Sequence, residues 1–332
     1  MKEHGTVAAA GRALGFKPST FSNRVERARE AGFVARPEPA QDIEHFAFPD
    51  DDVPVETILS TMSKRFTKRQ EYNKAKVWFP VKINHSLPCV FAFWGDPHLG
   101  ANGCNVPLLE RDVALCRDNE GVYGVNLGDV TDNWGGRLIV NYARSDSSQK
   151  TDYKLAKWFL KDSGIIWAIW ILGNHDEWND GAQIWAEISE NIIECHDWQA
   201  RFKIVFQNGK ECPIWAAHSF KGNSIWNTLH GPLRAAKFSG AMAKLYIQGH
   251  HHEWALHETE DEQSGNTFWL GKARGYKHVD NWGERHGFFP PQHGSTIAAV
   301  IDPMANPDSP AFIRCYPDLE QAVDFMKYLR AR

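Results

Sequence analysis

The feature that most constrains the fold is a series of short apolar runs, each of which ends in a cluster of polar residues. The clearest example is the run 164–172, which is rich in Ile and Trp and is followed directly by Gly173-Asn174-His175-Asp176. A run of this length and composition, ended by Gly-Asn, predicts a buried strand. The polar residues then lie at the carboxyl end of that strand, where open α/β sheets place their functional sites.

From about residue 83 onward, runs of this kind alternate with helical patterns, which is typical of an α/β protein. A chain of 332 residues has room for one large domain of this class and a smaller appendage. The predicted strands are 89–95, 122–127, 165–172, 202–206, 214–217, 244–248, 267–270, 297–301 and 312–315. The predicted helices are 106–119, 152–161, 183–194 and 319–329. Val-Ile-Asp-Pro at 300–303 predicts a hairpin, so we expect an α/β sandwich over residues 83–332.

The N-terminal segment, residues 1–36, predicts two short helices around a glycine turn. The stretch 10–25 has the small residue, the Leu-Gly turn and the apolar spacing of a helix-turn-helix, with 19–31 as its recognition helix. The side chains that could reach bases and phosphates are Thr20, Asn23, Arg24 and Arg27. An ordinary helical hairpin, packed on the main domain or mediating self-association, fits the same pattern, so both interpretations stand.

Residues 37–82 combine a linker with a basic stretch. The part 36–59 is rich in Pro and acidic residues, which is typical of a linker. Positive charge follows at Lys64, Arg65, Lys68, Arg69, Lys74, Lys76 and Lys82, with aromatic residues interleaved. This stretch predicts either attraction to a nucleic-acid backbone or a solvated helix face.

Composition narrows the class of protein. The chain has 42% hydrophobic residues, which excludes global disorder. Its longest apolar runs are far shorter than the ~20 residues that span a bilayer, and its N-terminus lacks the apolar core of a signal peptide. The six cysteines include no CxxC pair, which excludes a zinc ribbon and fits a reducing compartment. We therefore expect a cytoplasmic protein with no membrane partner. The sequence predicts no oligomeric state.

Charge is spread unevenly along the chain. Residues 1–82 carry 14 Lys and Arg against 11 Asp and Glu, whereas 83–332 carry 23 against 30. The acidic excess of the larger part is compatible with a cation site, although most surface carboxylates serve only solvation.

Five polar clusters follow predicted strands in order along the chain. They are Gly95-Asp96-Pro97-His98, Gly128-Asp129-Val130-Thr131-Asp132, Gly173-Asn174-His175-Asp176, Ala217-His218-Ser219 and Gly249-His250-His251-His252. A single histidine in such a place is usually only hydrogen-bonded, but five clusters favour a shared site. Carboxylate, imidazole and amide donors together suit Mn²⁺, Fe or Zn²⁺.

These clusters make residues 90–255 resemble the calcineurin-like metallophosphoesterase family, whose motifs run DxH, GDxxD, GNHD/E, H and GHxH. The resemblance implies a four-layer αββα sandwich, here with a small N-terminal helical segment. It also implies two divalent metal ions, Mn²⁺ first, with Fe, Zn or Ni as alternatives. The first ion would be held by Asp96, His98, Asp129 and His252. The second ion would be held by Asp129, Asn174, His218 and His250.

The resemblance also implies a reaction. Metal-activated hydroxide would attack phosphorus, and His175 would donate a proton to the leaving group, with Asp132 orienting or charging that histidine. For Asp176 a role at the site and a role as a helix cap are both open. His251 alternates with two ligands and is expected to point away from the ions.

The substrate is less constrained than the chemistry. Phosphoprotein phosphatases continue the second motif with Arg and Gly, whereas Asn133 and Trp134 follow Asp132 here. The motif set looks more like the Mre11-type nuclease and phosphodiesterase branch. Basic residues that could contact a substrate are Arg137 and Arg144 after the second motif, and Arg274 and His278 near the C-terminus, although surface solvation explains them equally.

We therefore expect a phosphodiesterase or nuclease that acts on nucleic acid. A small helix-turn-helix ahead of such a domain resembles proteins encoded by phages. The alternatives are a phosphomonoesterase or cyclic-nucleotide or small-molecule phosphodiesterase, and a DNA-binding regulator with a vestigial esterase domain.

Overall fold

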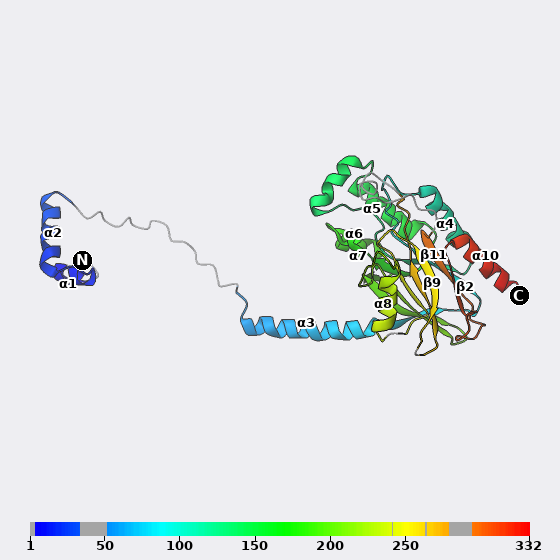
Figure 1. Ribbon diagram of the computed structural model, residues 1–332. Coiled ribbons are helices and arrows are strands. Elements are labelled where there is room, and N and C mark those ends of the chain that lie inside the picture. The colour runs from blue at the N-terminus through cyan, green and yellow to red at the C-terminus, as the bar shows by residue number, and fades with distance from the viewer. Residues whose placement is uncertain (1–3, 34–51, 241, 263, 279–293) are drawn as a thin grey trace. The chain divides into compact units, whose positions relative to one another are not determined.

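The computed structural model describes residues 4–33, 52–240, 242–262, 264–278 and 294–332. The chain divides into two compact units, Met1–Met62 and Ser63–Arg332. Figure 1 gives the order of their elements. Across the described residues, no helix combines the length and apolar character needed to cross a membrane.

The N-terminal unit contains the two predicted short helices, α1 (Val7–Ala13) and α2 (Pro18–Glu30). The Thr6 hydroxyl caps α1 by accepting the Ala9 N–H at 3.2 Å, and Pro18 opens the first turn of α2. The helices touch where Gly11 faces Phe21, because a Cβ on Gly11 would come within 2.8 Å of the Phe21 Cβ. The unit is therefore a tight helical hairpin with a small buried contact.

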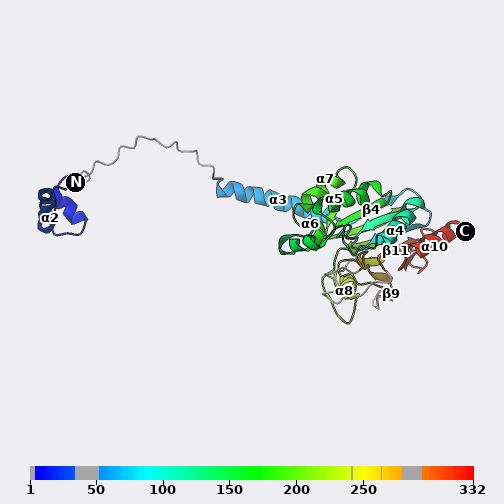
Figure 2. The same ribbon diagram turned by 90° about the horizontal axis from the view of Figure 1, so that it is seen from above.

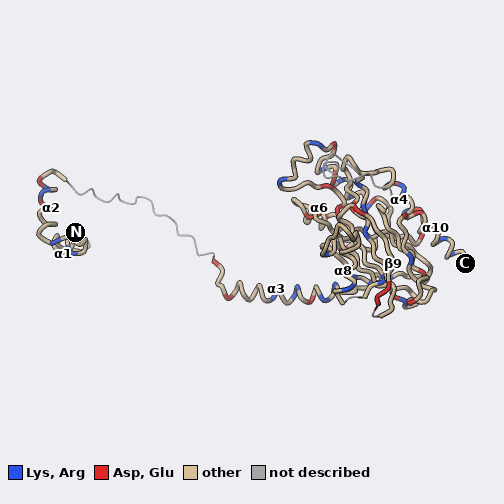
Figure 3. The backbone as a smooth tube through the Cα atoms, in the orientation of Figure 1, with Lys and Arg blue, Asp and Glu red and all other residues tan. Residues whose placement is uncertain are grey.

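A third helix, α3 (Val55–Ala75), covers the last residues of the predicted linker and the first part of the predicted basic stretch. It begins directly after Pro54 and contains neither Gly nor Pro, which explains why it continues for 21 residues. Lys and Arg occur along it (Figure 3). None of its residues is buried. The predicted linker residues 36–51 lie outside the described part of the chain.

Two six-stranded mixed sheets form the larger unit. In the first sheet the order is β1 (Val77–Ile83), β6 (Gln199–Phe206), β7 (Glu211–Ala217), β8 (Leu245–Gln248), β10 (Thr267–Lys272) and β9 (Ala255–Glu260). In the second sheet the order is β12 (Ile313–Tyr316), β11 (Thr296–Ile301), β2 (Cys89–Trp94), β3 (Val122–Asn126), β4 (Ile166–Leu172) and β5 (Cys195–Asp197). The predicted α/β sandwich is confirmed at this level.

The main hydrophobic core lies between the two sheets. Alternate residues of each strand point into it, among them Phe91 and Phe93 of β2 and Phe202 and Ile204 of β6, all completely buried. The other face of β2, with Val90 and Trp94, belongs to a second core. Both faces of this strand are therefore buried, which explains its continuous apolar sequence.

Helices cover the outer faces of both sheets. The second core is closed by α4 (Val106–Asp118), α5 (Gln149–Lys157), its π-helical continuation η2 (Trp158–Asp162), α7 (Gly181–Ser189) and α10 (Leu319–Arg330). A third core packs α8 (His230–Phe238) on the first sheet through Leu233 and Tyr246. Figure 2 shows α8 on the opposite side of the sandwich from α5 and α7.

All nine predicted strands and the predicted hairpin between β11 and β12 are present. Sequence reasoning missed β1, β5, β9 and α8. Pro80 lies within β1, where it is tolerated because β1 is an edge strand, and Pro232 lies in the first turn of α8. Because β1 pairs with β6, the sandwich begins before the expected boundary at residue 83.

Candidate metal centre

The sheet order brings the five polar clusters to neighbouring strand ends. In the second sheet, β2, β3 and β4 are adjacent and parallel, so the residues after all three strands meet at one edge. In the first sheet, β7 and β8 are adjacent and parallel, which places His218 and His250 side by side. The two strand edges thus supply every ligand that the sequence predicts.

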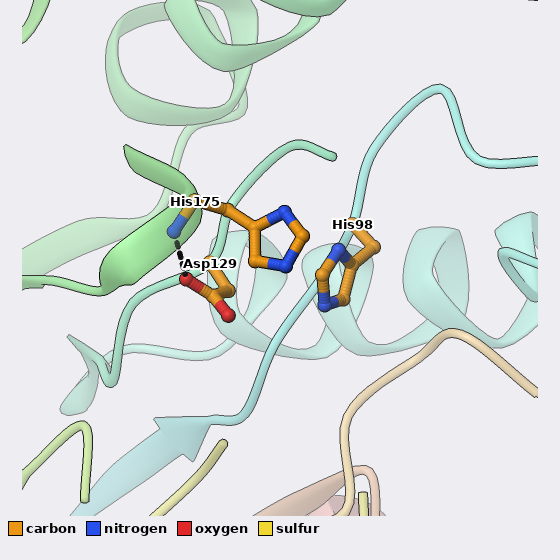
Figure 4. A group of neighbouring side chains, drawn as sticks. All are labelled: His98, Asp129 and His175. Carbon is orange, nitrogen blue, oxygen red and sulfur yellow. Dashed lines mark hydrogen bonds between the residues drawn. The ribbon is translucent and has the colours of Figure 1, made fainter. Parts of the chain in front are cut away.

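Two groups of His and Asp side chains lie close enough to hold metal ions, and they share one residue. The first group is His98, Asp129 and His175, and the second is Asp129, His218 and His250. Within each group the possible ligand atoms all lie within 4.8 Å of one another. Figure 4 shows Asp129 next to His175, with the His98 ring on the other side of the His175 ring. Asp129 therefore stands where a bridging carboxylate would be needed.

His218 contacts both other members of the second group and Asn174. Its Nε2 lies 3.3 Å from Asp129 Oδ2, 2.9 Å from His250 Nδ1 and 3.1 Å from Asn174 Oδ1. Its Nδ1 lies 2.8 Å from the Leu127 carbonyl, so this nitrogen donates there and Nε2 is the ring nitrogen that faces the other predicted ligands. Four of the predicted ligands thus converge on one point.

Of the other predicted ligands, His252 lies against His98, whereas Asp96 lies beside the second group, with its Oδ1 3.6 Å from His218 Nδ1. The His252 ring stacks on the His98 ring with 5.0 Å between centroids. Among the described residues, two buried atoms here have no hydrogen-bond partner, namely Asp96 Oδ1 and His98 Nε2. Buried polar atoms normally have a hydrogen-bond partner, so possible ligand atoms that lack one fit a bound cation.

The backbone is strained at most of the predicted ligands. Five of them have left-handed φ angles: Asp96 (29°), His98 (44°), Asp129 (52°), His250 (72°) and His252 (52°). Residues other than Gly rarely adopt this region, and such residues cluster at functional sites. The strained residues follow three different strands, β2, β3 and β8. The strain is therefore a feature of the whole site and not of a single turn.

Opposite charges dominate the electrostatics of the second group. Burial alone would raise the pKa of Asp129, but His218, His175 and His98 lower it well below its usual value. Burial would lower the pKa of His218, yet Asp129 and Asp96 raise it to about 9. The two side chains therefore form a tight ion pair at neutral pH.

Two of the predicted histidine ligands, His250 and His252, are held in the form that binds cations. Burial and the neighbouring His218 lower the pKa of His250 to about 4, and burial and His98 lower the pKa of His252 well below its usual value. Both imidazoles are therefore neutral at pH 7, as metal ligands must be.

His175 lies beside Asp129 without filling a predicted ligand position. Its main-chain N–H donates to Asp129 Oδ1 at 2.9 Å, and its ring packs on Trp178 at 4.1 Å and on Trp134 at 5.2 Å between centroids. Its Nδ1 contacts the Asp132 carbonyl oxygen, so that nitrogen carries the proton. Burial lowers its pKa, although Asp129 opposes the shift.

Asp132 contacts His175 through its main-chain carbonyl, and its charge raises the pKa of that ring, while its carboxylate bonds to other residues. Its Oδ1 lies 2.7 Å from His98 Nδ1 and 2.9 Å from Lys277 Nζ. Burial raises its pKa, but His98 and Lys277 outweigh burial, so the carboxyl stays ionised. Asp132 therefore holds a predicted metal ligand through its side chain and contacts His175 only through its main chain.

Asp176 connects two of the clusters. Its carboxylate accepts the N–H groups of Gly173, Asp129 and Val130 at 2.9, 2.7 and 3.0 Å. It lies in the short helix α6 (Asn174–Glu177), so the bond to Gly173 is the helix cap expected as one alternative. The bonds to the β3 loop are additional. Burial and Asp129 raise its pKa to about 7.

Sequence reasoning missed the role of Lys277. Its side chain is buried, bonds to Asp132 and lies over the Trp134 ring at 4.9 Å. It comes from the segment after β10, far along the chain, and no local pattern marks it. The surrounding stretch 272–278 also contains Lys272, Arg274 and His278, so its composition marks a basic segment but not the partner of any one residue.

The predicted substrate-binding residues fall into two regions. Arg137 and Arg144 are exposed on the 3₁₀ helix η1 (Gly136–Arg144). Arg274 and His278 flank Tyr276, whose N–H donates to the Asp96 carbonyl at 3.2 Å, so their segment passes the site. The rest of the predicted loop, 279–293, lies outside the described residues.

The predicted DNA-contacting residues belong to the N-terminal unit. Thr20, Asn23, Arg24 and Arg27 are all exposed on α2. The Arg24 guanidinium lies over the Phe16 ring at 5.2 Å, which fixes its direction along the hairpin.

His251 was expected to point away from the ions. Its Nε2 lies 3.4 Å from the Ser219 hydroxyl, beside the strand end that carries His218.

Comparisons with known proteins assign no family. No family model matches the sequence, and no curated protein matches it. Among solved structures, the chain is similar to "GAP50 the anchor in the inner membrane complex of Plasmodium". That match has 10% identity over 73% of this chain and 95% of that chain, with a TM-score of 0.35. A likeness at this level supports no conclusion about fold or activity.

Proposed function

We propose that this protein is a dinuclear-metal-dependent phosphodiesterase of the calcineurin-like type, with nucleic acid as its substrate. The observation that carries the proposal is that Asp129 belongs to two groups of possible ligands, one with His98 and His175 and one with His218 and His250. Of these, we assign His175 to proton transfer and the others to the metal ions. Support also comes from the arrangement of helices on both outer faces of two packed sheets, which fits the four-layer αββα sandwich of that family.

The donor set fits two divalent ions, Mn²⁺ first. One ion would be held by Asp96, His98, Asp129 and His252, and the other by Asp129, Asn174, His218 and His250. When bound, two such ions polarise a phosphoryl group, lower the pKa of the attacking water and neutralise charge on the attacking and leaving oxygens. The unpaired Asp96 Oδ1 and His98 Nε2 are the atoms that most need such a partner.

His175 would supply the proton that the leaving oxygen needs. Its Nδ1 is committed to the Asp132 carbonyl, so Nε2 is the atom that exchanges protons. Burial lowers the pKa of this ring, so its cation gives up a proton more readily than a free imidazolium, although Asp129 and Asp132 oppose the shift. Trp178 and Trp134 pack on the ring and restrict its rotation, which keeps Nε2 directed into the site.

Nucleic acid is the proposed substrate because basic surfaces lie outside the sandwich core. The exposed Arg24 and Arg27 of α2 and the Lys and Arg residues of α3 would attract phosphates. The Asn133 side chain donates to the His175 and Trp178 carbonyls at 2.9 and 2.8 Å. It therefore holds the proton donor's loop, where the phosphoprotein phosphatases would present an arginine.

The proposal is tested by giving three substrates to the Mn²⁺-loaded protein: single- and double-stranded DNA, bis-p-nitrophenyl phosphate and p-nitrophenyl phosphate. We expect hydrolysis of DNA and of the diester. The Asp129→Asn variant removes the shared ligand and should lower turnover at least ~1000-fold, the scale of a lost electrostatic group in an active site. Asp308→Asn, an exposed change of the same kind, should behave as wild type.

The other outcomes identify the alternatives. Turnover confined to p-nitrophenyl phosphate would make the protein a phosphomonoesterase. A protein that binds duplex DNA but turns over no ester, with or without Asp129→Asn, would be a regulator with a vestigial esterase domain.

A further inference from the structure

A cavity lies beside the candidate metal centre, on the outer face of the first sheet under α8. Its volume is about 390 Å³, which is within the range of small-molecule sites. Its lining includes Trp198, Arg201, Trp215, Lys221, Arg234 and Phe238. None of the predicted metal ligands is among them.

Trp198 and Ser219 form the wall between this cavity and the metal centre. The Trp198 ring packs against His218 at 5.1 Å and against His250 at 6.1 Å between centroids. Its Nε1 donates to the Ser219 carbonyl at 2.8 Å. Ser219 lines the cavity and directly follows His218, so the cavity adjoins a predicted metal ligand.

The cavity is positively charged and has no acidic lining residue. Its cations are Arg201, Lys221 and Arg234. Among the described residues, no carboxylate lies within salt-bridge distance of any of the three. In the same sheet, Lys203 is paired with Glu211 at 2.7 Å and Lys272 with Glu253 at 2.8 Å. Unpaired cations around one hollow favour an anionic ligand.

Aromatic rings accompany these cations. The Arg201 guanidinium lies over the Trp215 ring at 3.8 Å, and the Arg234 guanidinium lies near the Phe238 ring at 5.6 Å. Phe238 is 78% exposed, so its ring is available for further stacking. Adjacent cations and aromatic faces are the combination that binds phosphate and base together.

The framework of the cavity is fixed before any ligand binds. Trp215 Nε1 donates to Gln199 Oε1 at 2.9 Å, which orients the ring beneath Arg201. Gly222 has a φ of +110°, and a Cβ there would come within 2.9 Å of His230 and 3.2 Å of Arg234. The loop after Lys221 therefore lies against α8, which holds two of the cations on one rim.

We propose that this cavity binds one unstacked nucleotide of a single-stranded nucleic acid, next to the phosphodiester at the metal centre. The base would stack on the aromatic residues, and its phosphate would lie among Arg201, Lys221 and Arg234. The position of this nucleotide next to the hydrolysed phosphodiester rests on the proposed function, whereas the binding of the nucleotide in the cavity does not. A single strand is favoured over a duplex because a hollow of this size takes one nucleotide, which a paired strand does not release without unstacking.

The binding arm uses the full-length protein without metal and two dinucleotides, pTpT and pUpU, in isothermal titration. We expect binding that weakens about tenfold in Arg234→Ala and in Lys221→Ala, because each removes a phosphate contact. Both residues are exposed, so the variants should fold. Arg201→Gln should weaken binding further, since it also removes the cation stacked on Trp215.

The matched control is Lys237→Ala, which removes the same charge from α8 at a position outside the cavity. It should leave dinucleotide binding unchanged. Binding of pTpT, of pUpU or of both supports the subsite. Absence of binding, or equal weakening by Lys237→Ala and Arg234→Ala, would overturn it.

The catalytic arm separates this inference from the proposed function. In the Mn²⁺-loaded protein, Arg234→Ala should lower kcat/KM for a single-stranded oligonucleotide about tenfold more than for bis-p-nitrophenyl phosphate, because only the oligonucleotide reaches the cavity. A protein that binds pTpT in the cavity but hydrolyses no diester would refute the proposed function and keep the subsite. Hydrolysis of both substrates with the same loss in Arg234→Ala would refute the subsite alone.

Discussion

At the scale of single residues, the candidate centre depends on carboxylates that do different work although all are buried. Asp129 faces three histidines, which keep it ionised. Burial and the charge of Asp129 raise the pKa of Asp176 to about 7. Asp132 pairs with His98 and Lys277. Burial is common to the three carboxylates, so the neighbouring charges assign each one its role.

Asp176→Asn tests whether that carboxylate holds the metal-binding loops. The amide can accept at one oxygen only, so an NH₂ group would face the N–H of Val130 or of Asp129 and Gly173. We expect a loss of about 1–3 kcal/mol in the free energy of unfolding, the cost of an unsatisfied buried donor. Mn²⁺ affinity, measured by equilibrium dialysis, should fall about tenfold because the loop that carries Asp129 is no longer fixed.

The control for this change is Asp180→Asn. Asp180 is exposed at the start of α7, and its side chain makes no capping hydrogen bond. It should leave both stability and Mn²⁺ affinity as in wild type. Normal Mn²⁺ affinity in Asp176→Asn would show that this carboxylate only caps α6.

At the scale of elements, edge strands join the two sheets on the side away from α10. His196 of β5 stacks on Phe79 of β1 with 5.0 Å between ring centroids, and β5 and β1 are edge strands of different sheets. The last turn of α3 lies nearby, where the Tyr72 hydroxyl donates to Glu194 at 2.8 Å. A buried histidine thus lies where a helix and two sheet edges meet.

This histidine makes stability depend on pH. Burial, followed by Lys76, lowers the pKa of His196 to about 4, whereas an unfolded histidine titrates near ~6.5. The unfolded state therefore takes up the proton first, and stability that is complete above pH 6.5 is lost as the pH falls from 6.5 to 4. The loss attributable to His196 should be about 2.5 kcal/mol at pH 4.5.

His196→Phe isolates this contribution, because Phe keeps the stacking on Phe79 and cannot be protonated. Urea unfolding at pH 7.5 and 4.5, followed by tryptophan fluorescence, should show a smaller loss of stability in the variant than in wild type. An equal loss in the two proteins would mean that His196 is protonated in the folded state as easily as in the unfolded state.

At the scale of the whole molecule, two units combine different chemistry. The N-terminal unit offers a helical hairpin with exposed polar and basic residues on α2, and the larger unit contains the candidate metal centre. All residues of that centre come from the larger unit, so its chemistry does not need the hairpin.

Deleting residues 1–36 tests this division. Binding to duplex DNA should weaken, and the plot of log affinity against log salt should become shallower by about 0.9 for each phosphate that the shortened protein no longer neutralises. Hydrolysis of bis-p-nitrophenyl phosphate by the Mn²⁺-loaded protein should not change. Filter binding or anisotropy between about 50 and 200 mM salt measures the slope. Duplex binding with an unchanged slope would assign the hairpin to packing or self-association instead.

The sequence alone determined the strands and the chemistry that follows them. Continuous apolar runs mark β2, β3 and β4 because both faces of these strands are buried. The residue types that follow the strands predict the metal ligands. The sequence did not reveal β1 or α8, where Pro80 and Pro232 interrupt the pattern and only pairing or packing with distant segments stabilises the element.

The tertiary structure decided which groups meet. Asp132 and Lys277 are 145 residues apart. No local pattern predicts that the Asp132 carboxylate bonds to this lysine. Likewise, only the order of strands places Asp129 between two ligand groups and Arg201 over Trp215 beside them. Periodicity is a property of neighbours along the chain, whereas partners across a sheet depend on which strands pair, and that is fixed by the burial of the whole core.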